Sequence, residues 1–202
     1  MSCKPRAALS ISPTAPLLLA LFVMLSSPLL LAALLLAAAL HELGHCLALR
    51  ALHARVTAIR ISALGAEMQV AGSLSYGGEV LAAAAGPAVN LALALVLGLG
   101  GRLWEGMYLF SGAQLVLGVF NLLPIQPLDG GSILWNLSAW LTEPYTADRV
   151  AAAVSFGMAA LLTLAAAAAL WLGGSPFLLL AAMALFVRAV REIGLVKWVQ
   201  NG

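Results

Sequence analysis

The 202-residue chain has little charge: Asp, Glu, Lys and Arg together make up only 9% of it. Soluble domains are about 25% charged and roughly 45–50% apolar. This chain is 63% hydrophobic, and its mean hydropathy is +1.03. A soluble core of this length could not hide so much apolar surface. The composition therefore excludes a soluble domain and predicts an integral membrane protein whose surface contacts the lipid bilayer.

Basic clusters and cysteines are also scarce. The net charge is +2 and no Lys/Arg-rich block exists, so no nucleic-acid partner is expected. Cys3 lies near the N-terminus and Cys46 within an apolar segment, which argues against a structural disulfide. There is also no internal repeat, low-complexity tail or soluble second domain. We expect one domain over residues 1–202, without an appended regulatory domain.

Apolar runs interrupted by proline and glycine predict an all-α polytopic protein. As one helix, residues 17–49 would be ~50 Å long against a hydrocarbon core of ~30 Å, so Ser26-Ser27-Pro28 is interpreted as a break. The first run could also be a signal peptide, but it lacks a good cleavage site and apolar sequence resumes at once. Six transmembrane helices are expected, over residues about 13–26, 28–50, 79–99, 107–127, 148–171 and 175–195.

Positive charge predicts the orientation of these spans. With both termini in the cytoplasm, only Arg102 of the ten Lys and Arg residues faces out, in agreement with the positive-inside rule. The residues expected on the cytoplasmic side are Lys4, Arg6, Arg50, Arg55, Arg60, Arg149, Arg188, Arg191 and Lys197.

The segment between the second and third spans has a different pattern. Residues about 55–76 are β-branched and partly alternating, with Leu64-Gly65-Ala66 as a turn, so they predict a small membrane-associated β-hairpin. An unpaired edge of such a hairpin could add an extended peptide as an extra strand. An ordinary cytoplasmic connector explains the same residues about as well.

The most specific motif is His41-Glu42-Leu43-Gly44-His45, which follows an uncharged apolar run. HExxH on a helix places two imidazoles on one face at the spacing that grips one Zn²⁺, with the glutamate beside them as a candidate base. Ionisable groups inside a membrane are expensive and mark functional sites. The motif therefore predicts a protease that works inside the bilayer, with its site toward the cytoplasmic side.

A catalytic zinc takes three protein ligands, so a third is needed. Asp129 is the outstanding candidate, because it follows an apolar span between two prolines and two glycines, where the helix must break. Unwound backbone at membrane depth is tolerated only where it is buried in protein or lines a wet cavity. The other candidates fit solvated loop, lipid-facing or interfacial positions better: His53, Cys46, Glu67, Glu79 and Glu105.

Three motifs in order, HELGH at 41–45, AGPAVN at 85–90 and NLLPIQPLDGG at 121–131, resemble the site-2 protease family (peptidase M50), in particular the branch of stage IV sporulation protein FB. That resemblance implies an intramembrane zinc metalloendopeptidase in a bacterial cell membrane. Its substrate would be a membrane-tethered protein such as a sigma-factor precursor, and a membrane inhibitor or regulator would control it. By the same resemblance, one zinc is held by His41, His45 and Asp129, and Glu42 is the catalytic base. The residues it implies for substrate positioning are Asn121, Pro124, Pro127 and Asn90.

Two points separate this chain from relatives. Many relatives carry a basic residue after DGG, where this chain has Ser132, and the nucleotide-sensing domain of some relatives is not seen. Two other functions use the same motifs: a membrane metal-ion transporter and an inactive protease-like scaffold. The six spans offer few polar groups for a transport path, and all four catalytic positions are intact.

Overall fold

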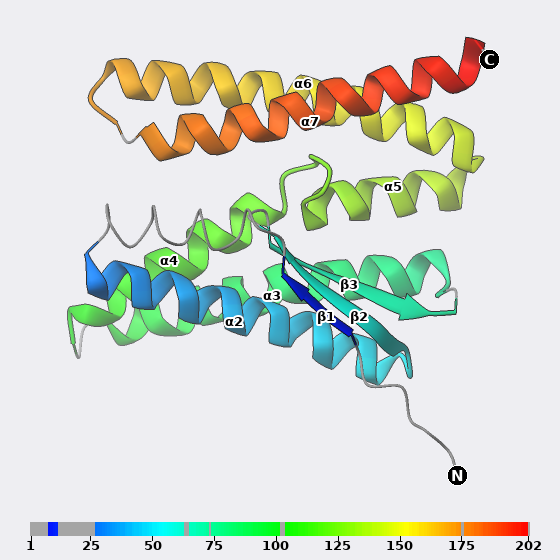
Figure 1. The fold of residues 1–202 in the computed structure, drawn as a ribbon. Coiled ribbons are helices and arrows are strands. Elements are labelled where there is room, and N and C mark those ends of the chain that lie inside the picture. Colours follow the sequence, from blue (N-terminus) through cyan, green and yellow to red (C-terminus); the bar gives the residue numbers. More distant parts are fainter. Residues whose placement is uncertain are drawn as a thin grey trace. The chain divides into compact units, whose positions relative to one another are not determined.

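A computed structural model of the chain describes residues 8–11, 27–62, 65–72, 74–101, 104–174 and 176–201. Contacts divide the chain into two compact units, Met1–Phe120 and Asn121–Gly202, and each is described by itself. The expectation of a single domain stays a prediction. The elements in order are β1 Ala8–Ile11, α2 Pro28–Ala51, β2 Arg55–Ser62, β3 Gly65–Ala71, α3 Tyr76–Gly100, α4 Gly106–Asn121, α5 Asp129–Leu141, α6 Pro144–Trp171 and α7 Pro176–Asn201 (Figure 1).

Helix α2 carries the HELGH motif and packs along α3 (Figure 1). It begins at the break expected at Ser26-Ser27-Pro28. The Ser27 hydroxyl caps the helix by accepting a hydrogen bond from the backbone N–H of Leu30 at 3.3 Å. Pro28 fits the first turn, because a backbone N–H there has no partner within the helix. Ser75 caps α3 in the same way, through the N–H of Gly78 at 3.2 Å. Both helices therefore start at serine caps.

Small side chains of α2 and α4 share one buried cluster. Ala33 and Ala37 of α2 are buried with Ala113 of α4, and larger apolar side chains pack around them. In a bilayer, lipid tails are as apolar as the side chains, so the hydrophobic effect does not drive helices together. Small residues instead allow helices to associate through close van der Waals packing. The partly buried side chains of this cluster are Leu34, Leu109, Phe110 and Leu117.

The first unit also holds a three-stranded sheet in the order β1-β2-β3. Strands β2 and β3 form the expected hairpin and pair antiparallel, from Arg55↔Ala71 to Ser62↔Gly65. Strand β1 pairs parallel to the other side of β2. The hairpin edge on β2 is therefore occupied, which the sequence did not predict, and among the described strands β3 forms the outer edge of the hairpin.

The second unit consists of α5, α6 and α7, with α6 packed against both of the others. Along α6 the buried face is built from alanines, including Ala147, Ala151 and Ala159. Residues 122–128, between α4 and α5, are not helical, and Ile125 in this loop is fully buried. The loop is held by the unit's own helices, so its conformation is fixed by packing.

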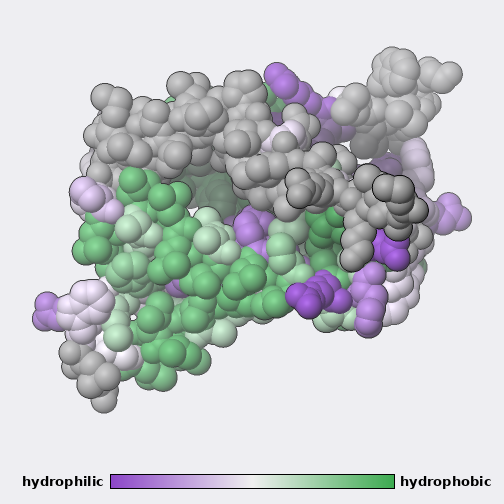
Figure 2. Space-filling model, turned by 60° about the horizontal axis from the view of Figure 1, so that its bottom comes forward, coloured by the Kyte–Doolittle hydropathy of each residue, from purple (hydrophilic) through white to green (hydrophobic). Residues whose placement is uncertain are grey.

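Within the described residues, three helices are long and apolar enough to cross a membrane: α2, α3 and α6. Large apolar side chains point outward from them, including Leu47, Leu95 and Leu164, as expected for contact with lipid. Figure 2 shows one face of the molecule, on which apolar residues form a continuous area. The membrane class is thus supported, whereas the count of six spans is not established.

Several expected boundaries differ from the structure. The span expected over 107–127 ends at Asn121, because Pro124 cannot continue a helix, and α4 has only 16 residues. Helix α5, with 13 residues, was not expected at all. The span expected over 13–26 lies outside the described residues. Helices α6 and α7 extend beyond the expected bounds, to Pro144 and Asn201.

Candidate metal centre

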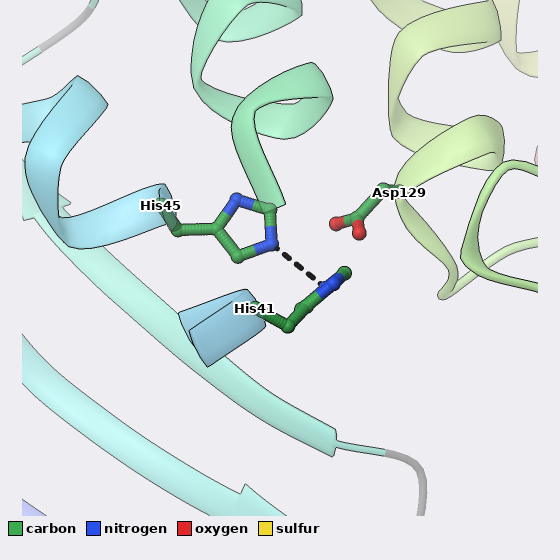
Figure 3. Close-up of side chains that lie close together, drawn as sticks. All are labelled: His41, His45 and Asp129. Atoms are coloured by element: carbon green, nitrogen blue, oxygen red, sulfur yellow. Dashed lines mark hydrogen bonds between the residues drawn. The ribbon is translucent and has the colours of Figure 1, made fainter. Parts of the chain in front are cut away.

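The two histidines of the HELGH motif lie together on one face of α2. The Nε2 atoms of His41 and His45 are 3.1 Å apart (Figure 3), and the two rings meet edge to face with centroids 4.7 Å apart. The i, i+4 spacing places them one turn apart on the helix. His41 is 5% exposed and His45 is half-buried, so both imidazoles are largely withdrawn from solvent.

The other ring nitrogen of each histidine points to an oxygen acceptor. The Nδ1 atom of His45 lies 2.8 Å from the backbone carbonyl oxygen of Ala82 on α3. A carbonyl oxygen can only accept, so Nδ1 of His45 carries the proton of this bond. In the neutral ring, the Nε2 atom of His45 then holds the lone pair.

The same reasoning applies to His41 through Asn90 of α3. The amide oxygen of Asn90 lies 2.6 Å from Nδ1 of His41, while its nitrogen donates to the backbone oxygen of Ala37 at 3.2 Å and to the side-chain oxygen of Gln114. The carbonyl of Ala37 can only accept, so the amide nitrogen of Asn90 must face it and the amide oxygen must face His41. Nδ1 of His41 therefore donates to the amide oxygen of Asn90.

Both neutral rings therefore direct Nε2 lone pairs toward one another at 3.1 Å. Two lone pairs at this distance repel unless a positive charge, a proton or a metal ion, lies with them. Neutral imidazole Nε2 atoms are common metal ligands. The donor set of this pair thus fits a cation, and its hydrogen-bonded Nδ1 atoms match the way metal-binding histidines are usually oriented.

Space for the two rings comes from glycine in α3. A Cβ atom at Gly86 would overlap Nε2 of His45 and would lie 2.9 Å from Cε1 of His41. Across the same interface, a Cβ at Gly44 of α2 would lie 2.7 Å from the backbone oxygen of Ala85. The glycines of HELGH and AGPAVN thus face the same contact between α2 and α3, and both bring the backbones close.

Glu42 follows His41 directly on α2 and is half-buried. One residue along a helix corresponds to a rotation of about 100°, so its carboxylate leaves the helix beside the histidine face. A carboxylate in that position can accept a proton from a group held near the two imidazoles.

In the second unit, Asp129 is the first residue of α5 and is half-buried (Figure 3). The partial positive charge at a helix N-terminus stabilises a carboxylate there. Gly130 and Gly131 follow it because no side chain fits: a Cβ on Gly130 would overlap the backbone of Leu122, and one on Gly131 would lie 2.6 Å from the carbonyl carbon of Ile125. The PLDGG sequence therefore sets the start of the helix and the place of its carboxylate.

The loop before Asp129 is held by a buried serine. The hydroxyl of Ser155 on α6 is fully buried and accepts a hydrogen bond from the backbone N–H of Gln126 at 3.1 Å. Pro124 and Pro127 lie in this loop and Asn121 ends α4. Their expected contribution to substrate positioning stays a prediction.

Gln114 is the residue of this region that the sequence reasoning missed. Its side chain is 1% exposed and contacts Asn90, so it belongs to the hydrogen-bonded group around His41. The available signal was its amide inside an otherwise apolar stretch of α4, since polar side chains within such segments are costly to bury without partners. His53, by contrast, follows α2 with a φ of 56°, outside the helix that carries the two motif histidines.

Two comparisons with known proteins found similarity to this chain. A family model described as Peptidase family M50 matches residues 99–165. Among solved structures, the fold is similar to the Site-2 Protease from Methanocaldococcus jannaschii, with 24% sequence identity and a TM-score of 0.70. That match covers 91% of this chain and 89% of the archaeal chain. No curated protein matches the sequence.

Proposed function

We propose that this chain is an intramembrane metalloendopeptidase that hydrolyses a peptide bond in or near a membrane-spanning or membrane-tethered segment of a protein. The observation that carries the proposal is the pair of imidazoles on the apolar helix α2, whose Nε2 lone pairs converge at 3.1 Å. The M50 match over residues 99–165 and the site-2 protease fold support the same activity.

The metal we assign is one Zn²⁺ per chain, held by His41, His45 and Asp129, each of which offers one ligand atom. Two imidazoles and one carboxylate are a usual ligand set for catalytic zinc, which keeps a further position open. Imidazole also selects against Mg²⁺ and Ca²⁺, which prefer oxygen ligands. When bound, zinc supplies Lewis-acid polarisation of the scissile carbonyl and lowers the pKa of water to roughly 7.

Glu42 is the catalytic base of the proposed reaction. Its carboxylate accepts a proton from the attacking water and returns that proton to the nitrogen of the leaving amine. The C–O bond forms first, and the peptide C–N bond breaks once the leaving nitrogen has taken the proton, so one water is consumed for each bond cut. General acid–base catalysis of this kind contributes about 10²- to 10⁴-fold to the rate.

A helical substrate must unwind before its peptide bond can react, because the bond is hidden in i→i−4 hydrogen bonds. Strand β3 offers an edge to which an extended segment can pair, and the loop around Pro124 and Pro127, with Asn121 before it, is the other proposed holding point. If proline substitutions that block pairing along β3 left cleavage unchanged, this assignment of the edge would be wrong.

The proposed setting is a bacterial cell membrane crossed six times, with both termini and the site toward the cytoplasm. Positively charged residues favour this orientation. The substrate class that follows is a membrane-tethered regulator, such as the sigma-factor precursor cut by the stage IV sporulation protein FB branch. A membrane inhibitor or regulator protein would then limit cleavage.

The test is co-expression of the chain with candidate membrane-tethered transcription factors, compared between wild type and Glu42→Gln. We expect wild type to release a fragment and to lose this activity on treatment with a zinc chelator. Glu42→Gln should bind the metal as wild type does but release no fragment. Proteolysis retained in Glu42→Gln would overturn the mechanism, whereas metal flux without any cleavage by wild type would favour a transporter.

A further inference from the structure

We propose that Asn90 and Gln114 are positioning residues that set the ring orientation and the tautomer of His41. The inference rests on the proposed metal function and deepens it. The amide oxygen of Asn90 accepts a hydrogen bond from Nδ1–H of His41. Gln114 accepts a hydrogen bond from the amide nitrogen of Asn90 and so keeps the oxygen turned toward His41. His41 is thereby kept with its Nε2 lone pair available to a metal.

The direction of every bond in this group follows from one backbone carbonyl. The nitrogen of the Asn90 amide donates to the oxygen of Ala37 on α2, 3.2 Å away, and to the side-chain oxygen of Gln114 on α4. Both hydrogens of the nitrogen are then used, which leaves the amide oxygen for His41. Turning the amide over would place two oxygens against each other at Ala37.

Burial makes this arrangement specific. Asn90 is 0% exposed and Gln114 is 1% exposed, so neither amide can exchange its partners for water. A buried polar group that loses its partner costs about 1–3 kcal/mol. The group also connects three helices, α2, α3 and α4, at one level of the first unit. The three bonds therefore hold side chains and backbone of these helices in one buried group.

His41 differs in this respect from His45. The Nδ1 atom of His45 is held by the backbone oxygen of Ala82, which no side-chain substitution removes. The Nδ1 atom of His41 is instead held by a side chain, that of Asn90, and this makes the proposal accessible to mutation. In metal sites, removing such a hydrogen-bonding partner of a ligand typically lowers metal affinity 10- to 100-fold.

Three substitutions separate positioning from a general packing role. Asn90→Leu keeps the approximate size and removes the acceptor, so Zn²⁺ affinity should fall about 10- to 100-fold. Asn90→Asp keeps an acceptor for His41 but sets a carboxylate against the oxygen of Ala37, so the protein should be less stable while affinity stays within a few-fold of wild type. Gln114→Leu leaves the bond to Ala37 in place and should lower affinity by less than Asn90→Leu.

The control is Ser111→Ala. The Ser111 hydroxyl donates to the backbone oxygen of Ala94 at 2.7 Å, which connects α4 to α3 one helical turn away from the Asn90–Gln114 pair. Losing this bond should alter stability but leave Zn²⁺ affinity unchanged. It therefore measures the effect of weakening the same helix contact without touching His41.

Affinity is measured on detergent-solubilised full-length protein by competition with a chromophoric zinc chelator. The visible spectrum of the Co²⁺-loaded protein and the ¹⁵N shifts of the metal-free imidazoles give readouts independent of activity. We expect the Nδ1–H tautomer at His41 in wild type and Asn90→Asp, and a mixture in Asn90→Leu.

The outcomes are distinct. If wild type binds neither Zn²⁺ nor Co²⁺, the proposed function fails, and this inference fails with it. Wild-type binding with an unchanged affinity and Co²⁺ spectrum in Asn90→Leu overturns the inference alone. So does an equal loss of affinity in Asn90→Asp and Asn90→Leu, because a role in packing would make affinity follow stability. Should Asn90→Leu fail to fold, Asn90→Asp and Gln114→Leu still decide between these results.

Discussion

Gly86 of α3 lies so close to His45 of α2 that a Cβ atom at position 86 would overlap the Nε2 atom of the imidazole. The same Cβ would lie 2.7 Å from Cε1 of His45 and 2.9 Å from Cε1 of His41. The bare backbone of α3 is thus one wall of the space in which the two rings converge. A missing side chain is as much a requirement of this site as the imidazoles themselves.

Gly86→Ala is accordingly expected to displace both rings and to lower Zn²⁺ affinity by at least about 10-fold, comparable with the loss of a hydrogen-bonding partner of a ligand. The matched control is Gly112→Ala in α4, where a Cβ meets nothing within 4 Å. Both changes gain about 1 kcal/mol of helix propensity, so propensity alone would affect them equally. Chelator competition measures the affinities, and equal values for the two variants would contradict this account.

The HELGH helix was predictable because its signals are local. Ser26-Ser27-Pro28 predicts a helix start, and the structure begins α2 at Pro28 with Ser27 as its cap. The i, i+4 spacing of two histidines needs nothing beyond helix geometry to bring their rings together. The alternating residues after Arg55 likewise predict a hairpin, which the structure forms from β2 and β3. Short-range periodicity therefore predicts these elements and two of the three proposed ligands.

The elements that were missed depend on contacts distant in sequence. Strand β1 has only four residues and gains its partner from β2, fifty positions later. Helix α5 has two glycines directly after its first residue, Asp129, and glycine has poor helix propensity. The close approach to residues 122–126 requires them. The contact of Gln114 with Asn90 joins two helices, and no periodic pattern in the sequence indicates it. Such features follow from packing, which a single sequence does not display.

Asp129→Asn tests the third proposed ligand. The substitution keeps the size of the side chain and its ability to sit in the first turn of α5, but removes the negative charge. Zn²⁺ affinity should fall more than about 100-fold. Removing a residue that only hydrogen-bonds to a ligand already lowers metal affinity about 10- to 100-fold, and removing the ligand's charge should cost more. The control is Asp148→Asn, since Asp148 on α6 is exposed and accepts a bond from Trp135 that an amide oxygen can keep. An unchanged affinity in Asp129→Asn would remove Asp129 from the ligand set.

Ser155→Ala tests how the loop before α5 is held. Without the hydroxyl, the backbone N–H of Gln126 loses its acceptor in a buried region, at a cost of about 1–3 kcal/mol in the free energy of unfolding. Detergent-titration unfolding, followed by circular dichroism, gives this difference. Thr163→Ala in the same helix is the control, because its hydroxyl bonds only the backbone oxygen of Ala159 one turn before it. The loop account is wrong if both variants lose the same small amount.

Ala33→Leu tests the packing that brings α2 against α4. Ala33 is 1% exposed and lies in the cluster with Ala37 and Ala113, so three extra carbons have no space there. Overpacking should lower the free energy of unfolding by about 1–3 kcal/mol. The neighbouring Ala32→Leu adds the same atoms to an exposed position on the apolar helix, where lipid or detergent accommodates them. The same unfolding titration compares the two variants, and equal stabilities would show that α2 and α4 do not meet at Ala33.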